Sequence, residues 1–257
     1  MQKLSSMMND SESSFDLTIE EILQKERDRY NAREVIGSGV YDCPSCKNKG
    51  WVMIEDRGYN VVKECNCNSI RESDLNINRS GLNEVFRQMT FESWIVNNNT
   101  QKVMLEQAKK FVEEFDGIKW FYIGGNSGSG KTHTCTALFQ ELMKNSYVGT
   151  YKRWHEVIKQ LKQEMNTKEY TYTMNDLKNC QLLYIDDFLK NASDSDMNIA
   201  FEIIQGRVDR HKATIISSEL FLQEIKDEAI SSRIKQMCGE YVLQIPRKKE
   251  NNFRLKD

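Results

Sequence analysis

The segment from Gly125 to Thr132 reads GNSGSGKT, which matches the phosphate-binding pattern G-x-x-x-x-G-K-[ST] at every fixed position. Glycines in such a loop let backbone N–H groups and the start of a following helix point at a phosphate chain. Lys131 is expected to reach the β- and γ-phosphates of ATP, and Thr132 to ligate magnesium. The predicted nucleotide-contacting residues are Gly125, Asn126, Ser127, Gly128, Ser129, Gly130, Lys131, Thr132 and the adjacent His133.

A magnesium-dependent site of this kind needs a second acidic group at the end of a neighbouring buried strand. The run Leu182–Asp187 reads LLYIDD and places two carboxylates directly after apolar residues. Asp186 is predicted to hold the magnesium ion, usually through water, and Asp187 to polarise the water that attacks the γ-phosphate. The simpler alternative is a strand-to-loop junction with a solvated pair of aspartates.

Two arginines are candidates for neutralising γ-phosphate charge in the transition state. Arg233 lies in SSRI, on a predicted helix just before the last predicted strand, and Arg254 lies in NFRL near the C-terminus. A solvated surface role is the simpler interpretation of either arginine taken alone.

Four of the seven cysteines form two close pairs. Cys43 and Cys46 stand in CPSC, and Cys65 and Cys67 stand in CNC, with 18 residues between the pairs. Two such pairs can close a tetrahedral zinc site, with the intervening residues as a small β-hairpin. Four cysteine ligands leave no open position, so the predicted site is structural, although four unrelated free thiols are the alternative. The second pair departs from the usual C-x-x-C spacing of a zinc ribbon.

The residues around these motifs alternate between strand and helix patterns from about residue 118 onward. Such alternation predicts an α/β fold with a parallel sheet and helices on both of its faces. Residues 16–34 read as a short amphipathic helix, 101–115 as another helix, and 166–180 as a loop. We expect an N-terminal helical and four-cysteine domain over residues 1–80 and an ATPase domain over residues 81–257. The predicted strands cover residues 118–124, 147–151, 181–187, 213–218 and 241–245, and the helices between them cover residues 132–146, 154–165 and 197–212, with one more before the last strand.

The composition is that of a globular protein: 39% of the 257 residues are hydrophobic, 29% are charged, and the formal net charge is −2. This balance excludes a broadly basic surface, so any contact with DNA must come from a local patch. Lys152–Trp154 and Arg247–Lys249 are the candidate patches, and the ring of Trp154 could stack on a base. No apolar run is long enough to cross a membrane, and the N-terminus lacks the apolar core of a signal peptide, so we expect a cytoplasmic protein.

Together these motifs resemble the DnaC/DnaI-type helicase loaders of bacteria and phages, which belong to the AAA+ ATPases and the IstB-like ATP-binding superfamily. The resemblance covers roughly residues 40–257 and is most similar to the phage or prophage branch. The four-cysteine module beside the ATPase motifs distinguishes this family from other P-loop proteins. The resemblance rests on CPSCKNKG with CNC, IGGNSGSGKTHTCTAL, TYKRWHEVIKQL, LLYIDD, TIISSEL, SSRI and NFR.

The resemblance implies an AAA+ fold with a small zinc-ribbon-like module, and a role for several further residues. Arg233 falls on the family's arginine finger, which acts on ATP bound to the neighbouring subunit, and Arg254 falls near its sensor-2 arginine. TIISSEL ends where the family usually has asparagine as sensor 1; here that position is Glu219, so Ser218 is the candidate for reading the γ-phosphate.

The resemblance also implies partners and a task. In such loaders the N-terminal module grips a DnaB-type replicative hexameric helicase, the ATPase part binds single-stranded DNA, and hydrolysis of ATP to ADP and phosphate times release. It further implies self-association with ATP or helicase, and slow turnover that the partner or DNA stimulates.

Two other functions fit the same motifs. A transposition helper ATPase of the IstB type shares the ATPase core but normally lacks a four-cysteine module of this kind. A zinc-stabilised interaction protein that uses ATP as a structural switch would show slow or absent turnover.

Overall fold

The computed structural model describes residues 18–33, 43–65 and 67–255. The chain divides into two compact units, residues 1–71 and 72–257, and the division falls within helix α2 (Cys67–Arg79). Among the described residues, no helix has both the length and the apolar character needed to cross a bilayer.

The first unit consists of one helix and one hairpin in its described part. Helix α1 (Ile19–Ala32) begins with a capping box in which Thr18 and Glu21 satisfy each other's backbone N–H groups. Strands β1 (Trp51–Asp56) and β2 (Tyr59–Glu64) pair antiparallel, which confirms the hairpin predicted between the cysteine pairs. The two residues of the turn, Arg57 and Gly58, both have positive φ, as a tight hairpin turn requires.

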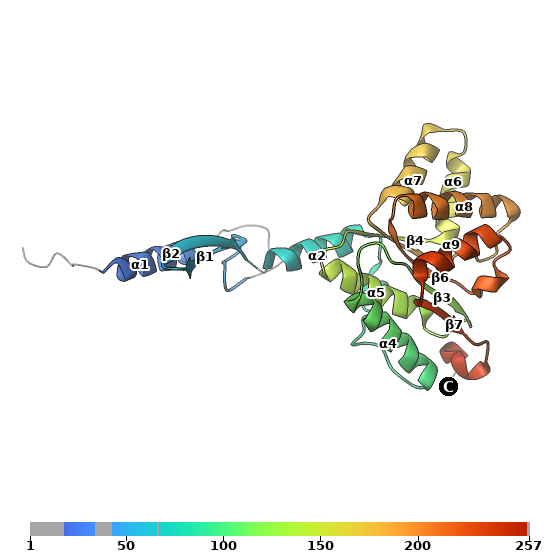
Figure 1. The fold of residues 1–257 in the computed structure, drawn as a ribbon, viewed down its shortest axis with the longest axis horizontal. Helices are drawn as coiled ribbons and strands as arrows, with labels where there is room; N and C mark the ends of the chain where they lie inside the picture. Colours follow the sequence, from blue (N-terminus) through green and yellow to red (C-terminus); the bar gives the residue numbers. More distant parts are fainter. Residues whose placement is uncertain (1–17, 34–42, 66, 256–257) are drawn as a thin grey trace, which may run out of the picture. The chain divides into compact units, whose positions relative to one another are not determined.

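The second unit contains a five-stranded parallel sheet with the order β4-β5-β6-β3-β7, which confirms the predicted sheet (Figure 1). In a parallel sheet all carboxyl ends meet at one edge, where ligands of α/β proteins bind. The strands are β3 (Phe121–Gly125), β4 (Gly149–Arg153), β5 (Leu182–Asp186), β6 (Ala213–Ser217) and β7 (Val242–Ile245).

Helices cover both faces of this sheet, as predicted (Figure 1). Alternate residues of β5 show the two faces: Leu183 and Ile185 join one apolar core, whereas Leu182 and Tyr184 join the other. The first core is closed by α6, α7, α8 and α9, and the second by α4 and α5. The helices of this unit are α3 (Glu84–Arg87), α4 (Asn99–Glu113), α5 (Lys131–Lys144), α6 (Trp154–Glu164), α7 (Lys168–Asn179), α8 (Asp194–Asp209) and α9 (Glu228–Cys238), with short 3-10 turns at Leu222–Glu224, Lys249–Asn251 and Phe253–Leu255.

One predicted element is wrong. Residues 166–180, expected to form a loop, contain helix α7. The segment is rich in Thr, Asn and Tyr, which have modest helix propensity, but Met174 and Leu177 are spaced to lie on one face and are buried in the core. Tertiary packing of these two side chains outweighs the local preference.

Candidate functional site

The phosphate-binding loop lies between β3 and α5, at the carboxyl edge of the sheet. Gly128 and Gly130 have φ values of 70° and 93°, which only glycine adopts without strain. Neighbours also leave no room for side chains, because a Cβ on Gly130 would lie 2.3 Å from the Trp94 ring and one on Gly128 would lie 2.2 Å from Asn252 Oδ1. Within the described chain no side chain caps the start of α5, so its N–H groups suit an anion.

Lys131 is the first residue of α5 and lies inside this loop. Its Nζ atom donates hydrogen bonds to the carbonyl oxygens of Gly125 (3.0 Å) and Asn126 (2.7 Å). Burial lowers the pKa of the Lys131 ammonium group, against the opposing effect of nearby carboxylates. An ammonium held among carbonyl oxygens and helix N–H groups is well placed to meet phosphate oxygens.

Asp186 ends β5 and is almost fully buried, yet it is surrounded by hydroxyl donors. Thr132 Oγ1 lies 3.1 Å from Asp186 Oδ1, and Tyr184 OH donates to the same oxygen at 3.1 Å. Tyr151 OH lies 3.4 Å from the second carboxylate oxygen, and Ser217 Oγ also donates to Asp186. A hydroxyl and a carboxylate oxygen side by side form the oxygen donor set that Mg²⁺ prefers, so Thr132 and Asp186 fit the predicted ion.

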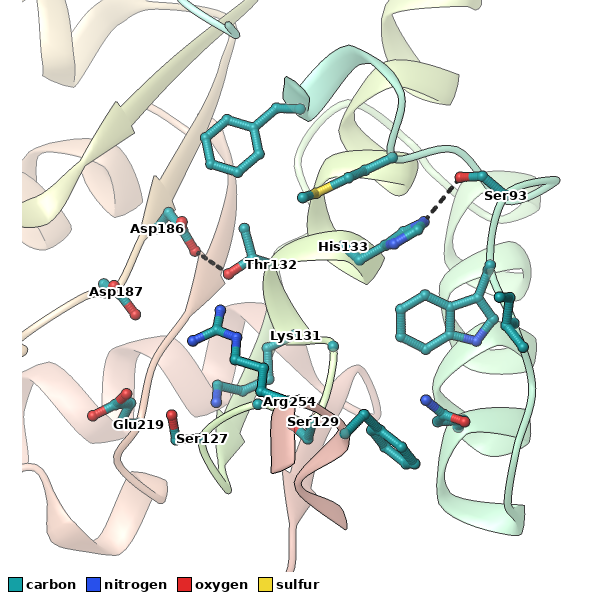
Figure 2. A pocket seen from close by; sticks show the side chains of 18 of the residues that line it. Ser93, Ser127, Ser129, Lys131, Thr132, His133, Asp186, Asp187, Glu219 and Arg254 are labelled. Carbon is teal, nitrogen blue, oxygen red and sulfur yellow. Dashed lines mark hydrogen bonds between the residues drawn. The ribbon is translucent and has the colours of Figure 1, made fainter. Parts of the chain in front are cut away.

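These residues face a cavity of about 510 Å³, which is in the range of small-ligand sites (Figure 2). One part of its lining is polar and charged, with the phosphate-binding loop, the two aspartates and Arg254. Another part is aromatic and apolar, with Phe86, Met89, Trp94 and Phe253. The cavity therefore suits a ligand with a flat apolar group at one end and an anionic chain at the other.

The structure brings most of the predicted site residues together. Ser127 to His133, Asp186, Asp187 and Arg254 all line the cavity. Asp187 follows directly after β5 with a φ of 55°, and its backbone N–H donates to Ser217 Oγ at 3.3 Å. His133 Nε2 contacts the Thr90 carbonyl oxygen at 2.9 Å, and burial lowers the pKa of its imidazole.

Three predicted residues, Gly125, Asn126 and Ser218, do not line the cavity. Gly125 is part of β3, and Asn126 turns its amide away to donate to the Lys248 carbonyl oxygen at 3.3 Å. Ser218 is buried, and its hydroxyl donates to the Phe188 carbonyl oxygen at 2.7 Å. Glu219, not Ser218, lines the cavity.

Arg233 lies on α9, outside the cavity of its own chain. Its guanidinium donates to the Ala229 carbonyl oxygen at 2.8 Å and to Gln205, and it stacks over Phe201.

Trp154 is not available for stacking on a base, so that prediction is wrong. Its side chain is 1% exposed and packs edge-on against Phe188 with ring centroids 5.0 Å apart. The neighbouring Arg153, flagged only as part of a basic patch, lines the cavity and pairs in register with Asp186. Its Nε donates to Tyr151 OH at 3.1 Å.

Trp94, Arg153 and Lys190 are cavity residues that we did not predict as site residues. Trp94 belongs to the segment of residues 80–98 before α4, which has no periodic pattern. The segment is held against α5 by His133 and by Gln140, whose Nε2 donates to the Met89 carbonyl oxygen at 2.9 Å.

The four paired cysteines meet in the first unit, with all their Sγ atoms within 4.8 Å of one another. Cys43 Sγ lies 3.8 Å from Cys65 Sγ, and Cys46 Sγ lies 3.3 Å from Cys67 Sγ. Zinc–sulfur bonds of about 2.3 Å in a tetrahedron separate the sulfurs by about 3.8 Å, so the cluster fits zinc. The backbone N–H of Cys46 is the main cause that lowers the pKa of Cys43 to about 6, whereas burial and the neighbouring sulfurs raise the pKa of Cys67. The case for zinc therefore rests on the positions of the four sulfurs.

Comparison with known proteins agrees with this geometry. Residues 61–235 match the family described as IstB-like ATP binding protein. The protein XkdC of the phage-like element PBSX of Bacillus subtilis is 30% identical over 219 residues, covering 79% of this chain and 82% of its own. The replicative helicase loader DnaC of Escherichia coli is 29% identical over 153 residues, covering 58% of this chain and 62% of its own.

A crystal structure of the DnaC helicase loader shares the fold, with a TM-score of 0.57 and 23% identity over 64% of this chain and all of that one. The family match spans β2 to α9 and therefore includes the phosphate-binding loop, both aspartates and Arg233. The chain thus belongs to the family of IstB-like ATP binding proteins, as a relative of the DnaC-type and phage-element members.

Proposed function

We propose that this protein is an ATPase of replication initiation that binds a replicative hexameric helicase and delivers it to single-stranded DNA. The observation that carries the proposal is the cavity where the phosphate-binding loop meets the Thr132–Asp186 pair, in a chain that also carries a separate cysteine unit. Its relatives include proteins named as replicative helicase loaders and a phage-element protein. The proposal therefore joins a nucleotide site to the task of those relatives.

The residues of the cavity have separate roles in this proposal. The ammonium of Lys131 and the N–H groups at the start of α5 hold the phosphate chain, and Arg254 adds positive charge from the C-terminal segment. Thr132 and Asp186 hold Mg²⁺, which when bound neutralises charge that develops on the phosphate oxygens. Asp187 orients a water molecule and accepts its proton, which yields ADP and phosphate. The rings of Trp94 and Phe253 exclude solvent from the apolar part.

Arg233 acts in trans in this proposal. Within its own chain it does not line the cavity, and it is anchored to α9 and α8. An arginine held rigidly at a distance from its own nucleotide can complete the site of a neighbouring subunit. Activity then depends on self-association.

The first unit holds zinc through its four cysteines and contacts the helicase. Its described part exposes large apolar side chains, including Ile19 at 77%, Tyr59 at 73% and Trp51 at 47%. Exposed apolar groups on so small a unit favour a protein partner.

The test is co-elution of the full chain with the replicative helicase of its host, with Mg-ATP and with Mg-ADP, followed by transfer of that helicase to circular single-stranded DNA. We expect a stable complex, and transfer that requires ATP. Lys131→Ala protein is expected to form the complex without completing transfer. If the parent protein neither retains the helicase nor increases its loading, the loader function is refuted.

Two alternatives predict different outcomes. A transposition helper would bind duplex DNA and ignore the helicase, but the named relatives favour the loader. A zinc-stabilised switch protein would bind ATP and the partner without turnover, so release of phosphate under helicase saturation separates it from the loader.

A further inference from the structure

One lysine joins two carboxylates at the charged end of the nucleotide cavity. Lys190 Nζ lies 3.1 Å from Glu219 Oε1 and 3.5 Å from Asp187 Oδ2. All three residues line the cavity, and each side chain is only partly exposed. Figure 2 shows Glu219 and Asp187 on the side of the cavity toward which Lys131 extends.

This end of the cavity is where the terminal phosphates of a nucleotide belong. The lysine of a phosphate-binding loop reaches the β- and γ-phosphates, and Thr132 and Asp186 would hold the ion that neutralises phosphate charge at the same place. Glu219 and Lys131 line the same cavity, and the Lys131 side chain extends toward the side on which Glu219 lies (Figure 2). Glu219 therefore lies close to the place that a γ-phosphate occupies.

A carboxylate at this place is ionised and repels phosphate. Partial burial of Glu219 opposes ionisation, but hydrogen bonding from Lys190 and the charge of that ammonium outweigh burial and lower the pKa of Glu219. The cavity lining contains three carboxylates, Asp186, Asp187 and Glu219, and four cations, Lys131, Arg153, Lys190 and Arg254. Without Lys190 the lining contains three cations and three carboxylates. Glu219 and Asp187 then lose the ammonium group that pairs with them.

ATP brings one more phosphate to this end than ADP does. Two like charges in a partly dry cavity repel each other more strongly than in water. We propose that Lys190 is a specificity-determining residue, which neutralises Glu219 and Asp187 so that the cavity accepts the γ-phosphate of ATP as well as ADP. The inference rests on the proposed nucleotide site and identifies the residue that decides between its two ligands.

The test measures binding, not turnover. The dissociation constants of a non-hydrolysable ATP analogue and of ADP, each with Mg²⁺, are determined by calorimetry for the parent and for Lys190→Met. Affinity for the ATP analogue is expected to fall about tenfold, which corresponds to about 1.4 kcal/mol. Affinity for ADP should change by less than about twofold, since it has no γ-phosphate to be placed beside the two carboxylates and repulsion weakens with distance. The double variant Lys190→Met/Glu219→Gln is expected to recover most of the lost affinity.

Lys110 provides a matched control. It also joins two carboxylates, at 2.8 Å from Glu240 and 3.8 Å from Glu114, and its side chain is 40% exposed compared with 42% for Lys190. Because it lies outside the cavity, Lys110→Met should leave both affinities unchanged.

Two results would overturn the inference. The first is an equal loss of affinity for the ATP analogue and ADP in Lys190→Met, and the second is no recovery in the double variant. Failure of the parent to bind either nucleotide would instead overturn the proposed nucleotide site itself, so the two failures are distinguishable.

Discussion

Removing one zinc ligand should unfold the first unit and leave the nucleotide site intact. We choose Cys67→Ser, because Cys67 is buried and its Sγ lies 3.3 Å from Cys46 Sγ. In the described part of this unit, the buried residues are the four cysteines and Gly50, which has no side chain. The unit therefore has almost no apolar core to replace the metal.

The expected loss of folding free energy is large, because the unit has almost no apolar core. Structural zinc contributes about 10–16 kcal/mol to the folding of small domains at neutral pH. The described contacts between the helix and the hairpin are polar and lie among exposed or half-buried groups, such as the pair of bonds between Asn31 and the backbone of Met53 at 2.9 and 3.0 Å. Polar bonds of this kind contribute about 1 kcal/mol each, so they cannot hold the unit without the ion.

The measurements are zinc content after washing with a chelator, amide hydrogen exchange, and affinity for Mg-ATP. The parent should retain about one zinc per chain, as expected for a closed four-cysteine site. The variant should lose zinc, lose protection of the amides of β1 and β2, and bind Mg-ATP as the parent does. Cys180→Ser is the matched control, since Cys180 lies outside the cluster and serine keeps an acceptor for Arg207. A parent protein free of zinc with a protected hairpin would refute the reasoning.

Four further results are expected. Lys131→Ala should abolish binding of Mg-ATP in calorimetry, because it removes the ammonium from the phosphate-binding loop; binding at parent affinity would contradict the site. Arg233→Ala and Lys131→Ala proteins should each lack ATPase activity, measured as phosphate release, because an arginine finger raises turnover on the order of 10³-fold or more. A mixture of the two should regain part of the activity, because some interfaces then pair an intact Lys131 with an intact Arg233. Arg207→Met should lower the free energy of unfolding by about 3 kcal/mol in denaturant melts. The buried guanidinium donates hydrogen bonds to the carbonyl oxygens of Leu177, Cys180 and Ala213, which methionine cannot replace. Hydrogen bonding from Arg247 lowers the pKa of Glu224 to about 2. The pair therefore stabilises the fold above about pH 5, and this stabilisation is lost as the pH falls toward about 2. Arg247→Met should remove this part of the pH dependence of the free energy of unfolding, measured in denaturant melts between about pH 2 and about pH 6.

The parts of the fold that could be predicted are those where local pattern and packing agree. Strands β3, β5 and β6 are short, largely apolar runs, and the glycines of the phosphate-binding loop mark the turn between β3 and α5. The hairpin between the cysteine pairs follows from the Arg57–Gly58 turn and the two ligand pairs. Helix α7 was missed because its apolar positions are few, and only contact with α8 and α6 makes them a buried face.

The residues of the site also differ in how far the sequence could predict them. Residues within a contiguous motif, such as Lys131 and Asp186, could be assigned from the sequence because the motif itself fixes their neighbours. Trp94 and Arg153 could not, because each comes from a different element and reaches the cavity only through the tertiary fold. Trp154 was misassigned for the opposite reason: an aromatic residue beside two basic ones favours a surface role, but α6 turns it into the core.

The glycines of the phosphate-binding loop show how nucleotide binding and the rest of the second unit are joined. Gly130 is packed under Trp94 of the segment before α4, and Gly128 is packed under Asn252 of the C-terminal segment. The two covering segments are themselves linked, because Asn98 Nδ2 donates to Asn251 Oδ1 at 3.2 Å. Any shift of the loop on binding phosphate must therefore move both segments or strain them.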